Sequence, residues 1–277
     1  MGTSHRHHAS VAGEPNWGKA SSAVTSLVTA IGEGEKIENN PPQNMTPRAI
    51  ERKQRSINNR VQNNYRKAVR RLIRAAGGRQ AVSSGSSKAI GHAGIALASS
   101  WMQTMAEIKE KGLGAWLNEH GVDTLEGKSA HDIFEIITGF IDADITSLDD
   151  TAAQAALQYV MGLIEDSMDD DDVEGSLNEI MSGDDVCEYI DMFFGVYVYS
   201  HLLQDFSEKI EKDKGSELEE TSMDEIRDLI IDDVRRGVNG RSARDIDWSG
   251  ADGKAFMQEE FDKIIGALTQ ENTKDED

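Results

Sequence analysis

The sequence has little of several features that mark particular protein classes. Its 277 residues include a single cysteine, Cys187, so no disulfide can form within the chain. No run approaches the about 18 consecutive apolar residues of a membrane-spanning helix, and the N-terminus lacks the apolar core of a secretory signal. We therefore expect a cytoplasmic protein without a membrane partner, in which Cys187 is a small buried side chain rather than a nucleophile.

Prolines and strand patterns are also scarce. All four prolines lie at or before residue 47, so beyond that point only glycine interrupts a helix. Alternating apolar and polar residues are absent, whereas apolar residues recur at spacings of three and four. The sequence predicts a mainly α fold, an irregular multi-helix bundle. A disordered N-terminal arm is expected over residues 1–45, which are rich in Gly, Ser, Asn and Pro, and a short polar tail over residues 269–277. Within the arm, the apolar patch "AVTSLVTAI" (residues 23–31) is suited either to form a turn or two of helix or to dock on a partner.

The region between arm and tail divides by composition into two parts. Residues 46–128 are predicted to hold a basic helix and a helix of small residues, and residues 129–268 an acidic helical region packed with them as one domain. The basic helix is expected over residues 47–76, with Thr46 as N-cap and Gly77 as its end. The small-residue helix, over residues 87–111, is expected to lie close against its neighbours. Capping residues predict further helices that begin at Ser129, Ser147, Asp184 and Ser222, followed by a last one over residues 253–268.

Charge is distributed very unevenly along the chain. The net charge is -21, yet residues 46–80 carry 11 basic and 1 acidic side chains, while residues 129–277 carry 11 basic and 40 acidic ones. Two readings of the basic helix are open. It binds nucleic acid, or it contacts the acidic body or an acidic partner, a reading favoured because the body repels nucleic acid. The residues assigned to this contact are Arg66, Lys67, Arg70, Arg71 and Arg74.

Motifs of catalysis and of metal binding do not match. In the stretch "SSGSSKAIGHAG", Gly85 is separated from Lys88 by two serines, and no glycine stands five places before Gly85, so the phosphate-binding loop G-x-x-x-x-G-K-[ST] is not matched. We expect a helix cap with a close backbone approach instead. The stretch "DIDWSGADGKAF" resembles a calcium loop at its first positions, but Phe256 stands where the glutamate belongs. No histidine or cysteine has the spacing of a zinc site. We therefore predict no catalytic residue, no metal ligand and no cofactor.

A family resemblance is carried by three stretches. They are "MGTS" at the start, "NNYRKAVRRLIRAAGGRQAVSSGSSKAIGHAG", and "MAEIKEKGLGAWLNEHGVDTLEGKSAHDIFEII". Together they resemble the B component of the Qat bacterial anti-phage defence system, over about residues 1–8 and 60–140. The acidic C-terminal half is similar only in its general character.

The resemblance implies a non-enzymatic subunit. The other components of such systems are an ATPase, a TatD-like nuclease and a protein similar to 7-cyano-7-deazaguanine synthase. By analogy, the synthase-like partner would attach a deazaguanine-type base to the amine of Gly2 after Met1 is removed, and would recognise Thr3 and Ser4. A glycine amine is unhindered, and α-amino groups have a pKa of about 8, which leaves a usable neutral fraction at pH 7. The alternative function is that of a nucleic-acid-binding accessory acting through the basic helix.

Overall fold

The computed structural model describes residues 16–87, 89–122, 128–141, 148–169, 172–182, 185–237 and 246–269. These residues form eleven helices and no strand, which confirms the predicted mainly α class. Within this part of the chain, no helix is both long enough and apolar enough to cross a membrane.

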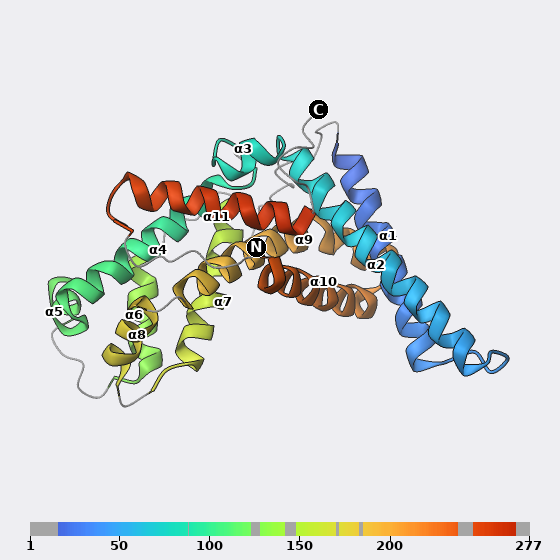
Figure 1. Ribbon diagram of the computed structural model, residues 1–277, viewed down its shortest axis with the longest axis horizontal. Coiled ribbons are helices and arrows are strands. Elements are labelled where there is room, and N and C mark those ends of the chain that lie inside the picture. The colour runs from blue at the N-terminus through green and yellow to red at the C-terminus, as the bar shows by residue number, and fades with distance from the viewer. Residues whose placement is uncertain are drawn as a thin grey trace, which may run out of the picture.

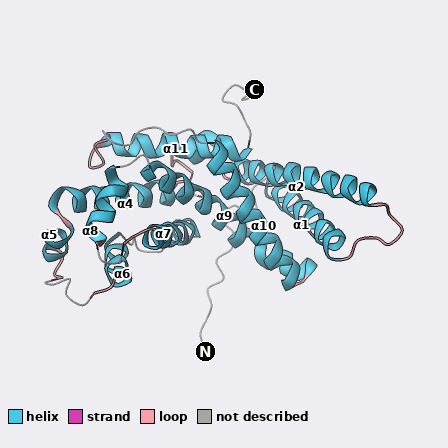
Figure 2. Ribbon diagram, turned by 60° about the horizontal axis from the view of Figure 1, so that its bottom comes forward, coloured by secondary structure: helices cyan, strands magenta, loops and turns pink. Residues whose placement is uncertain are grey.

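The helices form a body from which one hairpin projects (Figure 1). The hairpin consists of α1 (Trp17–Asn39) and α2 (Pro47–Ala75), which pack along each other, and Figure 2 shows its loop far from the other helices. The helix α9 (Asp185–Lys214) runs through the middle of the body and packs against α7 and α10. The remaining helices are α3 (Arg79–Ser83), α4 (His92–Lys111), α5 (Leu113–Glu119), α6 (Ala130–Ile141), α7 (Leu148–Asp166), α8 (Val173–Ser182), α10 (Ser216–Gly237) and α11 (Ala251–Thr269).

The N-terminal region differs from the predicted arm. The sequence predicts disorder over residues 1–45, yet Trp17–Asn39 form the 23-residue helix α1. Its buried side chains include Ala20, Val24, Leu27 and Ile31, which recur at spacings of three and four and pack against α2. Serine, threonine and glycine between them obscure this stripe, and tertiary packing outweighs their low helix propensity. The first 15 residues and residues 270–277 lie outside the described part of the chain.

The predicted helix starts were partly correct. Thr46 precedes α2, Pro47 is its first residue, and Ser129 and Asp132 exchange the hydrogen bonds of a capping box ahead of α6. The predicted start at Ser222 is wrong. The helix α10 begins at Ser216, directly after Gly215, whose φ of 93° ends α9, and Ser222 is fully buried inside it. Ser147 and Asp184 lie outside the described residues.

The small-residue helix α4 lies close to its neighbours, as predicted. It begins at His92, five residues later than expected, because Ser87 caps a turn by accepting a hydrogen bond from the N–H of Ala89. Gly91 has a φ of 110° and lies directly against the carbonyl oxygen of Val82. A Cβ atom on Gly94 would stand 2.5 Å from the ring of Tyr197 on α9. These two glycines therefore allow the close approach that larger residues would block.

Candidate functional site

The five basic residues assigned to a nucleic-acid or acidic-partner contact do not share one free surface. The guanidinium of Arg70 donates to the carbonyl oxygen of Thr269 at the end of α11, over 2.8 Å. Arg66 lies near Asp233 of α10. Burial raises the pKa of the Asp233 carboxyl, and the positive charge of Arg66 lowers it. Arg71 is half-buried, and only Lys67 and Arg74 are exposed. Part of the basic helix thus faces α10 and α11 of the body.

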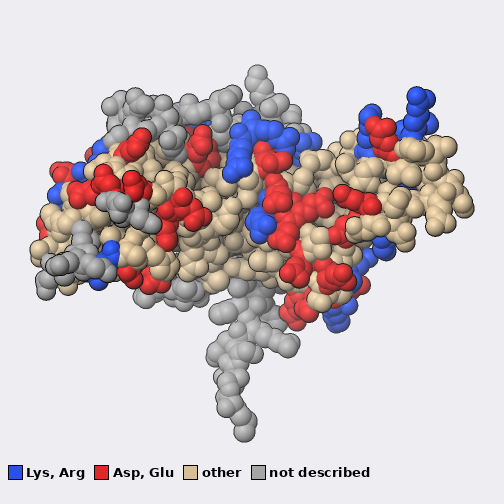
Figure 3. Space-filling view, turned by 90° about the horizontal axis from the view of Figure 1, so that it is seen from below, with Lys and Arg blue, Asp and Glu red and all other residues tan. Residues whose placement is uncertain are grey.

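The outer half of the hairpin carries a separate basic surface. Arg60 pairs with Glu33 of α1, and Arg55 pairs with Glu51 over 2.6 Å. The first turns of α2 additionally expose Arg48, Arg52 and Lys53. Figure 3 shows acidic side chains over much of one face of the molecule and a group of basic ones at the free end of the hairpin.

Gly2, Thr3 and Ser4, which the family resemblance singles out, lie outside the described residues. The described chain starts at Asn16, and the next residue is anchored. The ring of Trp17 stacks on that of Phe206 of α9, with the ring centroids 4.9 Å apart. The start of α1 is therefore fixed to the central helix of the body.

A buried polar cluster joins the start of α4, the start of α7 and the middle of α9. Its members are Asp149, Tyr197 and His201, and we call it the Asp149 cluster. The carboxylate of Asp149 accepts hydrogen bonds from the N–H of Ala93 at 2.8 Å, from the hydroxyl of Tyr197, and from Nε2 of His201 at 3.0 Å. The Tyr197 oxygen in turn accepts from the N–H of Gly91 at 2.6 Å.

The Asp149 cluster combines a carboxylate and a histidine as hydrolytic sites do, but it is closed to solvent. Asp149 is 3% exposed and His201 is 1% exposed. Burial raises the pKa of Tyr197 well above its usual value, and the nearby charge of Asp149 raises it further, so the hydroxyl remains a donor. Every member is hydrogen-bonded to another group of the protein, so the arrangement holds three helices together.

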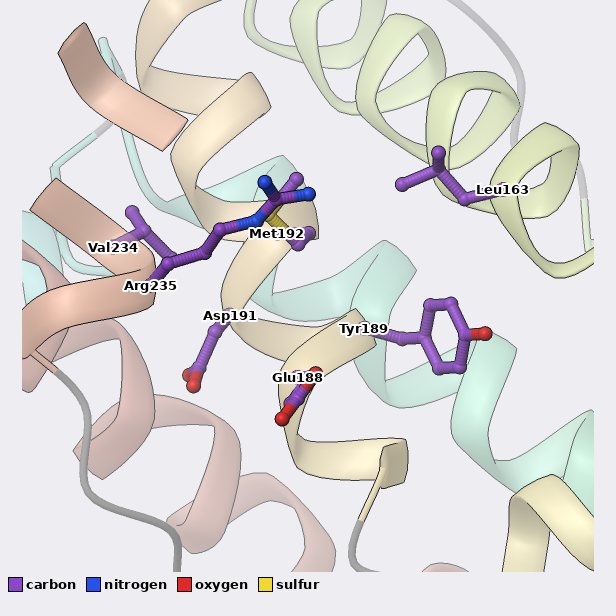
Figure 4. Close-up of a pocket in the computed structure, with 7 residues that line it drawn as sticks. All are labelled: Leu163, Glu188, Tyr189, Asp191, Met192, Val234 and Arg235. Atoms are coloured by element: carbon purple, nitrogen blue, oxygen red, sulfur yellow. The ribbon is translucent and has the colours of Figure 1, made fainter. Parts of the chain in front are cut away.

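A cavity of about 500 Å³ lies where α7, α9 and α10 meet, and we call it the α9 cavity. Figure 4 shows Leu163 reaching toward α9 from α7, and Arg235 extending from α10 across α9 beside Met192. Asp191 and Glu188 leave α9 on one side, and Tyr189 points away from them. Its lining residues are Leu163, Glu188, Tyr189, Asp191, Met192, Val234 and Arg235.

Asp191 is the unusual member of the α9 cavity. It is only 6% exposed, and its Oδ1 atom has no hydrogen-bond partner among the described residues. Burial raises the pKa of Asp191 to about 8, with further increases from the charges of Glu260 and Glu188 and an opposing effect from Lys263. The carboxyl is therefore mostly protonated at neutral pH. Sequence reasoning assigned Asp191 no role, although an acid inside the apolar run "YIDMFFGVYV" is a visible signal.

A second cavity, of about 390 Å³, lies between α4, α6 and α7. Gln154 lines it, is 5% exposed and leaves its Nε2 atom without a described partner, while Phe140 exposes part of its ring there. This cavity is more apolar than the α9 cavity, and its one unsatisfied group is a neutral amide. It therefore gives a weaker indication of ligand chemistry.

Comparison with known proteins identifies the family. Residues 77–268 match the family model described as Qat anti-phage system associated protein QatB. This match spans α3 to α11 with the Asp149 cluster and the α9 cavity, and it leaves out the α1–α2 hairpin. No curated protein and no solved structure gives a significant match. Because the matched stretch covers more than two thirds of the chain, the protein belongs to the QatB family of accessory components of the Qat anti-phage system.

Proposed function

We propose that the chain is a non-catalytic adaptor of its defence system, which presents its N-terminal segment to a 7-cyano-7-deazaguanine-synthase-like partner for modification at Gly2. The family supports the role in anti-phage defence. The observation that carries the adaptor role is the anchoring of α1 on α9 through Trp17 and Phe206. The segment before Asn16 is joined to the body at this one fixed point.

The anchor limits where the partner can bind. Fifteen peptide units separate Gly2 from Trp17, and a fully extended chain covers at most about 3.6 Å per residue, or about 54 Å. The partner's catalytic site must therefore lie within that distance of Trp17 when the amine of Gly2 is bound. The helix α1 makes this span much shorter than the 45-residue arm predicted from the sequence.

The test is the intact mass of the protein after co-expression with the synthase-like partner. We expect a mass increase that tandem mass spectrometry places on Gly2, and its loss when the partner's catalytic residue is inactivated. Gly2→Ala should reduce the modification and the protection against phage, because the added methyl group crowds the amine. Ser10→Ala, within the same segment, is the matched control and should be modified normally. An unmodified Gly2, together with full protection by Gly2→Ala, would overturn the proposal.

Nucleic-acid binding is a second candidate because of one observation, the exposed basic surface at the free end of the hairpin. Arg48, Arg52 and Lys53 lie at the end of the hairpin that projects away from most of the acidic body (Figures 1 and 3). Affinity for short duplex DNA and RNA, measured by fluorescence anisotropy, should then fall steeply with salt. The double variant Arg52→Glu, Lys53→Glu should remove it, while Arg60→Gln, at a residue already paired with Glu33, should reduce it less. Absence of binding at low salt would eliminate this candidate.

A further inference from the structure

We propose that the outer half of α2 binds duplex DNA through the helix face opposite α1. The inference rests on the second candidate function, nucleic-acid binding, and names its substrate class and its contact surface. That surface is a row of exposed side chains that follow one another at helical spacing, and we call it the α2 stripe. Its members are Arg48, Arg52, Arg55, Asn59 and Asn63.

The α2 stripe lies on the side of α2 that does not pack on α1. Spacings of four, three, four and four residues place its members on one side of a helix with about 3.6 residues per turn. Ile57 and Val61 are buried on the other side, and a Cβ atom on Gly34 of α1 would stand 3.4 Å from Ile57. The stripe is therefore a straight ridge about 22 Å long, because each of the 15 steps from Arg48 to Asn63 rises about 1.5 Å.

Charge is segregated between the two helices at this end of the hairpin. Residues 47–63 carry five basic side chains and one acidic side chain, that of the exposed Glu51. Burial raises the pKa of Glu225 on α10, and the charges of Glu35 and Glu38 on α1 raise it further, so both α1 carboxylates lie near α10. A polyanion that approaches α2 therefore meets a local positive field, although the whole chain has a net charge of -21.

The α2 stripe has the donors of a phosphate-binding surface and lacks the core of a protein interface. Guanidinium and amide N–H groups donate to phosphate oxygens. Protein interfaces are instead centred on aromatic or aliphatic side chains that become buried on binding. Every exposed residue between Arg48 and Asn63 is polar or charged. These features favour a nucleic acid over an acidic protein as the partner.

The hairpin is better suited to a duplex than to a single strand. Proteins that bind single strands stack the bases on aromatic side chains. The hairpin has two aromatic residues, and neither is available: Trp17 stacks on Phe206 of α9, and Tyr65 is 0% exposed. The stripe therefore offers contacts to the phosphates of a strand and no surface on which its bases can stack.

The shape of the hairpin favours DNA over RNA among duplexes. The major groove of B-form DNA is about 12 Å wide and admits an α-helix, whereas the major groove of A-form RNA is too narrow for side chains to read. The outer end of α2 projects from the body, and Figure 2 shows no other helix of the body beside it. A straight, convex ridge in this position can reach phosphates on both sides of a B-form groove.

The test is fluorescence anisotropy of the full chain with a short DNA duplex, with one of its strands and with an RNA duplex of the same sequence. We expect the DNA duplex to bind roughly tenfold more tightly than either of the others at the same salt concentration. The logarithm of its association constant should fall with the logarithm of the salt concentration with a slope of about -3, because three arginines contact phosphates.

Two variants in the middle of the α2 stripe and one matched control locate the contact. Arg52→Gln should weaken binding and make the salt slope shallower by about 1. Asn59→Asp places a carboxylate among the arginines and should weaken binding roughly tenfold. Asn39→Asp makes the same change at the exposed end of α1 and should leave binding nearly unchanged. All three sites are exposed, so circular dichroism should show an unchanged fold.

Each contrary result has a distinct meaning. If the single strand or the RNA duplex binds as tightly as the DNA duplex, this inference fails and the nucleic-acid candidate remains. If Asn39→Asp weakens binding as much as Asn59→Asp does, affinity follows total charge and the α2 stripe is not the site. If no nucleic acid binds at low salt, both the inference and the candidate fail, and loss of phage protection in Asn59→Asp would then assign the stripe to an acidic protein. None of these outcomes changes the mass measured at Gly2.

Discussion

Two buried carboxyl groups meet the central helix α9, and their surroundings are opposite. Asp149 accepts hydrogen bonds from a backbone N–H, a tyrosine hydroxyl and a histidine ring. Asp191 is almost as buried, yet one of its oxygens has no partner among the described residues. The first group lies at a junction of three helices, and the second lines a cavity.

The difference separates an acid that stabilises the fold from one that weakens it. A buried carboxylate that is fully hydrogen-bonded rigidifies its surroundings, whereas an unsatisfied one incurs the full free-energy cost of desolvation. A protein tolerates that cost most readily where binding requires it. The two acids should therefore respond in opposite directions to substitution.

The largest effect is expected for Asp149→Ala. The change leaves the N–H of Ala93, the hydroxyl of Tyr197 and the ring of His201 without their common acceptor, so the free energy of unfolding should fall by about 3–5 kcal/mol. Urea denaturation monitored by circular dichroism measures it. Asp166→Ala, at an exposed site on the same helix α7, should change stability by less than about 0.5 kcal/mol. Equal effects of the two substitutions would contradict the structural role of the Asp149 cluster.

Asp191→Asn should act in the opposite direction and depend on pH. The folded protein raises the pKa of Asp191 from 3.8 to about 8, so between these values the folded state binds more protons than the unfolded state. The contribution of Asp191 to the stability of the folded protein is therefore lost progressively as the pH rises from about 4 to about 8. Asparagine cannot ionise, so the variant should match the parent near pH 4 and exceed it by roughly 2–4 kcal/mol at pH 8.

A second acid calibrates that result. Burial raises the pKa of Asp205 to about 6. The loss of folding stability caused by ionising Asp205 should therefore be complete by about pH 6. Asp205→Asn should therefore gain less stability, with no further gain between pH 6 and pH 8. Denaturation curves at pH 4, 6 and 8 compare the two variants. A flat profile for Asp191→Asn would show that Asp191 is ionised and paired in the folded protein.

The sequence could predict local features of this fold better than long-range ones. The helix α2 begins at Pro47 and ends shortly before Gly77, which are both local signals, and its predicted range differs from the observed one by a single residue. The Thr46 side chain makes no capping hydrogen bond. The full length of α1 was missed because its stability comes from packing on α2 and α10, including Leu218 against Gly32. Such contacts between distant segments leave only weak local patterns.

The same contrast between local and long-range signals applies to the two buried acids. Asp191 is detectable in principle, because a single acid inside a buried apolar run is a local signal. The Asp149 cluster is not detectable in this way, because its members lie 48 and 52 residues apart along the chain. In a chain with 50 acidic residues, proximity in sequence does not distinguish a cluster of this kind from solvated surface.

The smallest effects are expected at the two glycines that bring partner groups close to these acids. Alanine should gain about 0.5–1 kcal/mol of helix propensity at either position. At Gly94 the new Cβ would stand 2.5 Å from the Tyr197 ring, and displacing that ring also weakens the hydrogen bond from Tyr197 to Asp149. The overpacking cost of about 1–3 kcal/mol should therefore exceed the gain in helix propensity. At Gly195 the Cβ would meet mainly one methyl group of Val234, at 2.9 Å, beside a cavity that can absorb the shift.

Thermal unfolding of both variants therefore shows which region is packed more rigidly, the one around Gly94 or the one around Gly195. Gly94→Ala should lower the free energy of unfolding by about 1–2 kcal/mol, and Gly195→Ala should change it by less than about 0.5 kcal/mol. Gly162→Ala, in α7 with no atom within 4 Å of the new Cβ, is the control and should stabilise the protein. A larger loss at Gly195 than at Gly94 would mean that α9 and α10 are locked together as tightly as the Asp149 cluster.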